Sequence, residues 1–183
     1  MASKMQTLDD LYTNMLKDLY SAEKQLVKAL PKMAKNAQAS DLQRAFQEHL
    51  KQTEGHVERI ERIFSDLGSS PRGKKCVGME GLVEEGNELL QEQIDPDVLD
   101  ASLIAAAQKV EHYEIATYGG LVQLALTMGL HRAADILEKT LTEEEDTDQQ
   151  LTFIAEGYIN VEAENEGGYS WEKHEETEEN VNA

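Results

Sequence analysis

Apolar residues recur every three or four positions along four long segments of the chain, which is the spacing that lines one face of an α-helix. The pattern predicts helices over about 7–37, 40–68, 97–128 and 130–159. Thr7 precedes an acidic turn and is a candidate N-cap, whereas Gly68 and Gly129 stand where the second and third helices should end. Pro31 lies inside the first segment, where it predicts a kink or an early stop.

The links between these segments indicate how the helices are arranged. Only a few residues join the first helix to the second and the third to the fourth, so each pair should form an antiparallel hairpin. The pairs are joined by 69–96, which is rich in Gly, Ser and Pro at its start and should carry a short helix near 79–92. We therefore predict an all-α fold, a ferritin-like four-helix bundle of two antiparallel hairpins with a long crossover that carries a short extra helix. The bundle should occupy 1–159, and 160–183 should form an acidic, mobile tail.

Polar residues interrupt the apolar stripes near mid-height on all four predicted helices. They lie three or four residues from core positions and therefore face inward. These residues are Glu23, His49, Thr53, Glu111, Glu114, Tyr118, Glu144 and Asp148. Antiparallel pairing about the short loops should bring Glu23 near Thr53 and Glu114 near Glu144.

The two hairpins resemble a degenerate repeat. A shift of 91 positions superimposes their apolar registers and also places Glu23 on Glu114 and Thr53 on Glu144. Thr53 therefore stands where the repeat would place a fourth glutamate.

Inward carboxylates need compensation, because burying an isolated one costs several kcal/mol and neighbouring like charges raise one another's pKa. They could be protonated, they could meet buried Lys or Arg, or they could share a metal ion. Lys24, Lys51 and Lys109 fall on outward rows, and we find no inward basic residue at this height other than His49. A metal site is therefore favoured over a metal-free network of protonated carboxylates.

Carboxylate and imidazole ligands suit iron or manganese, as one ion or as a bridged pair. The best candidate ligands are Glu23, Glu111, Glu114 and Glu144, followed by Asp148 and His49. Tyr118 could donate a hydrogen bond to a bound oxygen species. The sequence assigns no catalytic residue.

The ligand set departs from the usual di-iron bundle, which carries Glu-x-x-His on two helices. Glu54 falls nearer the flank of its helix than the core, and His56 and His112 are expected to flank the bundle. Within "EEEDTD", 143–148, only Glu144 and Asp148 are expected to face inward.

Charge and composition limit the partners. The chain has 36 acidic and 17 basic residues and a net charge of −19, which disfavours binding to a nucleic-acid backbone. Cys76 is the only cysteine, so no intramolecular disulfide can form, as in a protein of the reducing cytoplasm. No apolar run resembles a signal peptide or a membrane span. We expect a cytoplasmic protein without nucleic-acid or membrane partners.

Five stretches closely resemble the YciF-like family of bacterial stress proteins, in order and at the family's spacing over roughly 5–158. They are "LYSAEKQL", "HLKQTEGHVERIE", "CVGMEGLVEEGNELL", "LIAAAQKVEHYEIATYG" and "LTEEEDTDQQL". The resemblance implies a ferritin-like bundle with an additional short helix, a homodimer, and a link to general or osmotic stress. It also implies a relationship to rubrerythrins and similar di-iron proteins, but no known reaction.

Together these observations predict a cytoplasmic stress-response protein with a carboxylate-rich iron or manganese site that reacts with peroxide or oxygen. The alternative is a non-catalytic dimeric stress protein whose polar layer holds no metal and fixes helix register. Iron sequestration without turnover is a third possibility.

Overall fold

Helices make up almost all of the part of the chain that the structure describes. The computed structural model describes residues 5–165. Its elements are α1 (Leu8–Asn36), α2 (Ser40–Asp66), α3 (Val77–Leu89), α4 (Pro96–Thr127), α5 (His131–Ile154), the π-helical turn η1 (Ala155–Ile159) and α6 (Asn160–Asn165). None of these helices combines the length and apolar character needed to span a bilayer. Most of the predicted tail, 166–183, lies outside the described residues.

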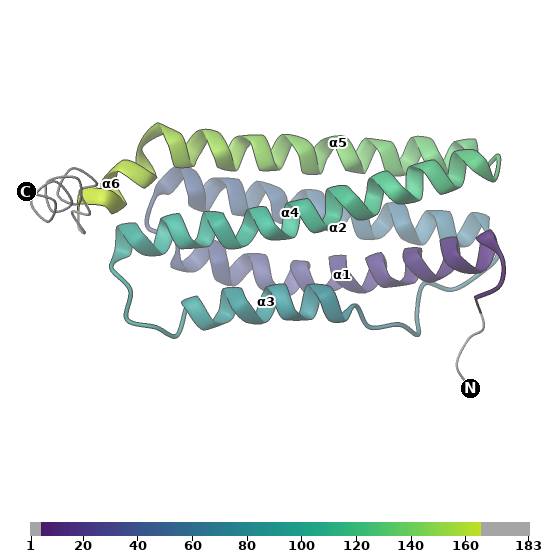
Figure 1. The fold of residues 1–183 in the computed structure, drawn as a ribbon, viewed down its shortest axis with the longest axis horizontal. Coiled ribbons are helices and arrows are strands. Elements are labelled where there is room, and N and C mark those ends of the chain that lie inside the picture. Colours follow the sequence, from purple (N-terminus) through teal and green to yellow (C-terminus); the bar gives the residue numbers. More distant parts are fainter. Residues whose placement is uncertain (1–4, 166–183) are drawn as a thin grey trace, which may run out of the picture.

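The bundle consists of two hairpins, α1–α2 and α4–α5 (Figure 1). α1 packs on α2 and α4 packs on α5, while α2–α5 and α1–α4 contacts join the hairpins. Each helix runs antiparallel to both of its neighbours, because the crossover returns the chain along the length of the bundle before α4 begins. α3, within that crossover, lies on the outside against α1 and α4. The predicted bundle of two hairpins, with its extra helix, is confirmed.

The ends of the helices follow local sequence signals. Thr7 caps α1 by accepting a hydrogen bond from the Asp10 amide at 3.1 Å, and the Asp10 carboxylate accepts one from the Thr7 amide at 3.1 Å. Gly68 and Gly129 adopt positive φ angles of 61° and 73° directly after α2 and α4, as the sequence predicts. α1 continues past Pro31 to Asn36, so the early stop considered there does not occur.

The start of α2 is capped by a different helix. Ala39 precedes α2 and offers no capping side chain. Buried Asp100 of α4 accepts hydrogen bonds from the Gln38 amide at 2.8 Å and the Ala39 amide at 2.7 Å. The second hairpin thereby holds the turn of the first, which fixes the relative height of the two.

The crossover is anchored near the start of α3. The Cys76 amide donates to Ser21 Oγ at 2.9 Å, and Gln25 of α1 donates to the Cys76 carbonyl at 3.0 Å. Tyr113 of α4 donates to Asp18 of α1 at 2.9 Å beside these contacts. These bonds tie α1, α3 and α4 together close to mid-height.

We predict that Asp100→Ala lowers the free energy of unfolding by about 1–2 kcal/mol, because two amides at the start of α2 lose their charged acceptor. Urea unfolding followed by circular dichroism measures the change. Asp146→Ala, which removes an exposed carboxylate from α5, is the control and should change the stability by less than about 0.5 kcal/mol. Equal effects of the two substitutions would show that Asp100 is not a cap.

Candidate metal centre

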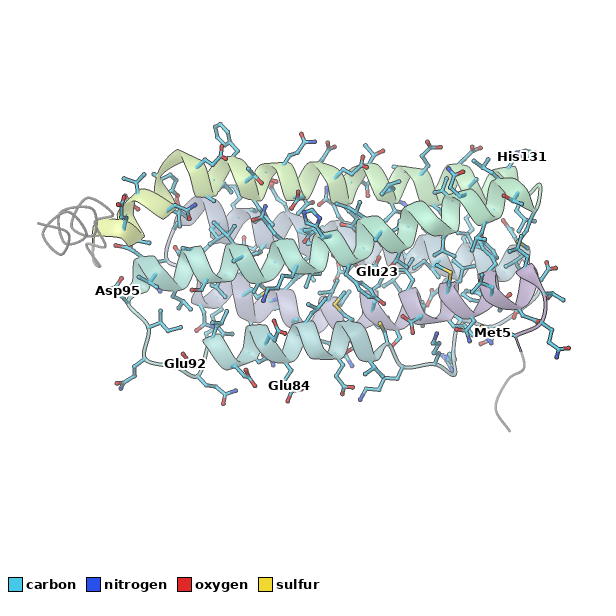
Figure 2. All side chains as sticks on the ribbon, in the orientation of Figure 1. Met5, Glu23, Glu84, Glu92, Asp95 and His131 are labelled. Atoms are coloured by element: carbon cyan, nitrogen blue, oxygen red, sulfur yellow. The ribbon has the colours of Figure 1, made fainter. Side chains whose placement is uncertain are left out.

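Five of the six predicted ligands meet in the buried core, and His56 joins them. Ligand atoms of His49, Glu111, Glu114 and Glu144 lie within 4.8 Å of one another, and so do those of Glu23, His56 and Glu144. We call these sets the four-residue group and the three-residue group. Glu144 belongs to both, so they form one centre to which α1, α2, α4 and α5 all contribute. Figure 2 shows its Glu23 about halfway along the bundle.

The four-residue group places an imidazole among carboxylates. His49 Nε2 lies 3.4 Å from Glu111 Oε1 and 3.9 Å from Glu144 Oε2. Both oxygens of Glu114 are buried without a hydrogen-bond partner among residues 5–165, and Glu111 Oε2 shares this condition. Buried acceptors of this kind indicate that a proton or a cation belongs between them.

The neighbours of His49 orient its ring. Its Nδ1 lies 3.4 Å from Gln52 Oε1 and 3.3 Å from Thr147 Oγ1. The Thr147 hydroxyl donates its own hydrogen to the Glu143 carbonyl at 2.9 Å, so its oxygen is an acceptor toward His49. The network therefore assigns the hydrogen of neutral His49 to Nδ1 and leaves the Nε2 lone pair facing the carboxylates.

His56 is the residue that the sequence analysis misplaced. It is 0% exposed, and its Nδ1 lies 3.0 Å from Glu144 Oε1 and 3.6 Å from Glu23 Oε1. The expectations that it flanks the bundle, and that His49 is the only inward basic residue at this height, are wrong. The signal was present in the sequence, because His56 follows His49 by seven positions and Thr53 by three, which keeps it on the same face.

Glu143 contacts the outer nitrogen of the His56 ring. Glu143 Oε2 lies 3.0 Å from His56 Nε2. Arg59 donates to both oxygens of Glu143, at 2.7 and 2.8 Å, and also to Thr140 Oγ1 at 3.0 Å. Burial opposes ionisation of Glu143, but the bonds from Arg59 and His56 outweigh it and lower its pKa. Glu143 thus contacts a residue of the centre, although only Glu144 and Asp148 of this run were expected to face inward.

Glu23 and Thr53 complete the inner surroundings. Tyr118 donates a hydrogen bond to Glu23 Oε1. The buried Thr53 hydroxyl donates to the His49 carbonyl at 2.8 Å within its own helix. One turn further along α2, His56 lies beside Glu23 and Glu144.

Asp148 lies outside both groups. Its side chain is 20% exposed, accepts a hydrogen bond from Gln108 at 3.1 Å, and lies 3.6 Å from exposed His112. The prediction that His112 flanks the bundle agrees with its exposure, and Glu54 is likewise exposed. The structure thus brings Glu23, His49, Glu111, Glu114 and Glu144 together and leaves Asp148 at the rim.

The metal-free centre retains protons. Burial, reinforced by neighbouring carboxylates, raises the pKa of Glu111 and Glu114 well above the ordinary glutamate value. Burial also lowers the pKa of His49, which favours its neutral form. In His56 burial opposes protonation, but the nearby Glu144 and Glu23 outweigh it and raise the pKa to about 10. Four carboxylates and two imidazoles form a donor set that iron and manganese accept once these protons leave.

Comparison with known proteins identifies the family. A family model described as "Domain of unknown function (DUF892)" matches residues 7–164. The chain belongs to this family. Protein YciF of Escherichia coli (strain K12) is 48% identical over 162 residues, which cover 88% of this chain and 98% of that protein. The resemblance found in the sequence is thereby confirmed.

Solved structures confirm the fold. The crystal structure of the E. coli stress protein YciF covers 85% of this chain and 99% of its own, with 46% identity and a TM-score of 0.82. YcfI from Rhodopseudomonas palustris covers 83% of this chain and 97% of its own, with 39% identity and a TM-score of 0.80. The dodecameric thioferritin of Bacteroides fragilis, with 16% identity and a TM-score of 0.65, covers 86% of this chain and 90% of its own and shares the fold alone.

We predict that the metal-free protein loses stability as the pH rises from about 5 to 8. Glu111 and Glu114 have a raised pKa when folded, so their contribution is complete below the unfolded pKa and is lost as the pH passes the folded one. Melting temperatures of chelator-treated protein across this range measure the loss.

Glu114→Gln should flatten this dependence, because the amide imitates the protonated carboxyl group. Glu145→Gln, at an exposed neighbouring position of α5, controls for the general effect of removing one negative charge from an acidic protein. An unchanged slope in Glu114→Gln would show that Glu114 does not contribute to the pH dependence.

Proposed function

We propose that this protein is a ferritin-like stress protein that binds two divalent iron or manganese ions in the mid-bundle centre. The observation that carries the proposal is Glu114, because both of its oxygens are buried and no described side chain satisfies them. Leaving such a charge uncompensated costs several kcal/mol. A cation shared with His49, Glu111 and Glu144 removes that cost.

The two groups correspond to two metal positions. His49, Glu111, Glu114 and Glu144 would hold one ion, and Glu23, His56 and Glu144 would hold the other. Glu144 belongs to both groups, so it would contribute to both positions. In each group one nitrogen of an imidazole faces the carboxylates. The other nitrogen of the same ring contacts Gln52 in His49 and Glu143 in His56.

Paired iron or manganese ions supply electrons for the reduction of peroxide or oxygen. The protein's own part is to hold the donors in place and to keep water out. Tyr118 orients Glu23 through its hydrogen bond, and burial keeps His49 neutral and able to donate its Nε2 lone pair. Burial of Glu23, Glu114 and Glu144 excludes solvent from the carboxylates.

The relatives support the cellular role. The E. coli relative is described as a stress protein, and its sequence matches 88% of this chain. We extend that role to this protein and propose that it acts in the cytoplasm as a homodimer.

We predict that protein purified without chelator and titrated with Mn(II) binds two ions per chain. Glu144→Ala should abolish most binding because both positions lose a ligand, whereas Glu114→Ala should remove one ion. Elemental analysis after desalting gives the stoichiometry, and Glu145→Ala is the control for charge removal. Substoichiometric metal that neither Glu114→Ala nor Glu144→Ala alters would contradict the metal site.

We further predict that the iron- or manganese-loaded protein consumes peroxide faster than buffer with the same free metal, as followed with an oxygen electrode and a colorimetric peroxide assay. Consumption at the buffer rate would refute the reaction but leave the metal site standing. The non-catalytic alternative makes a different prediction. Combined Glu23→Gln and Glu144→Leu should then keep or raise the melting temperature, because buried carboxylates are replaced and no bound ion is lost.

A further inference from the structure

We infer that Glu143, clamped by Arg59, is the positioning residue that makes His56 a metal ligand and so sets the affinity of the three-residue position. This inference rests on the proposed function of the centre. It concerns two residues that contribute no ligand atom to either group.

The contacts form a chain from the centre toward the surface. His56 Nδ1 faces Glu144 and Glu23, and its Nε2 lies 3.0 Å from Glu143 Oε2. Arg59 donates hydrogen bonds to both oxygens of Glu143, at 2.7 and 2.8 Å. The planar guanidinium and the carboxylate pair in the two-bond geometry that fixes both groups in orientation.

In the neutral imidazole that binds an ion, these contacts decide which ring nitrogen of His56 carries the hydrogen. Glu144 at 3.0 Å and Glu23 at 3.6 Å both attract a hydrogen to Nδ1, where it would block an ion. Glu143 offers a competing acceptor at Nε2, and Arg59 keeps that acceptor in place. A carboxylate behind a metal-bound histidine orients the ring and increases its donor strength, and its loss typically weakens metal binding about 10- to 100-fold.

The other histidine is held differently, so the two positions are unequal. Within residues 5–165, the partners of His49 Nδ1 are a neutral amide oxygen and a hydroxyl, at 3.4 and 3.3 Å. Its group has four ligands, whereas the group of His56 has three and shares Glu144. The ion with fewer ligands thus depends on the charged support, and the ion at His49 does not.

The test uses calorimetric titration of full-length, metal-free protein with Mn(II). Wild type should show two binding events per chain. Glu143→Gln should weaken one event about 10- to 100-fold and leave the other unchanged. Arg59→Lys, which keeps the charge but loses the two-bond grip, should weaken the same event by a smaller factor. Glu145→Gln, the same charge change one residue beyond Glu144, should leave both events unchanged.

A second measurement follows the ring itself. In protein loaded with diamagnetic Zn(II), the Nε2 hydrogen of His56 should give a slowly exchanging proton resonance. In Glu143→Gln that resonance should broaden through exchange with water, and the corresponding Nδ1 resonance of His49 should persist. Melting temperatures of the metal-free variants show that each is folded.

The outcomes separate the inference from the proposed function. If wild type binds no Mn(II), the metal centre itself is refuted. If wild type binds two ions and Glu143→Gln binds both with unchanged affinity, the centre stands and the positioning role is overturned. Equal weakening of both events would also overturn it, because the residue would then act on the whole centre and not through His56.

Discussion

The constraint on which the structure depends is the burial of four glutamates in one layer of a helical bundle. Removing a carboxylate from water costs several kcal/mol even after relaxation, and a second one nearby adds repulsion. Glu23, Glu111, Glu114 and Glu144 are each at most 2% exposed, so water cannot screen them. Protons or cations must therefore lie among them. The raised pKa values of Glu111 and Glu114 show that these carboxyl groups hold protons in the metal-free protein.

The carboxylates can share protons or cations only if the four helices hold them at one height. The helices that carry it belong to two hairpins separated by a long crossover, so the short loops alone cannot align them. Contacts outside the layer supply the alignment. Asp100 of α4 binds the turn between α1 and α2, and Tyr113 of α4 binds Asp18 of α1. Polar bonds at the turn and at the crossover thus set the register in which the carboxylates meet.

The sequence predicted the helices and most of the layer because both depend on the period of the α-helix. It located Glu111, Glu114 and Glu144 by their distance from apolar neighbours, and these positions lie deep in their stripes. Positions at the edge of a stripe are different. Thr147 and Asp148 fall on opposite sides of Glu144, about 60° and 40° around the helix. The structure buries Thr147 and leaves Asp148 partly exposed, which depends on the neighbouring helices and not on the period. His56 could have been predicted, since seven residues bring a helix almost to the same orientation.

The repeat register also explains why the centre is lopsided. The shift of 91 positions that places Thr53 on Glu144 places His49 on Thr140 and His56 on Thr147. On α2 the hydroxyl of Thr53 therefore lies between two imidazoles. At the matching positions of α5, the carboxylate of Glu144 lies between two hydroxyls. The hydroxyls of α5 contact residues of α2, because Thr147 lies 3.3 Å from His49 and Thr140 accepts from Arg59 at 3.0 Å. α2 and α5 thus contribute different kinds of side chain to the centre. α2 supplies both imidazoles, and α5 supplies the shared carboxylate together with Thr147 and Glu143, which contact His49 and His56 respectively.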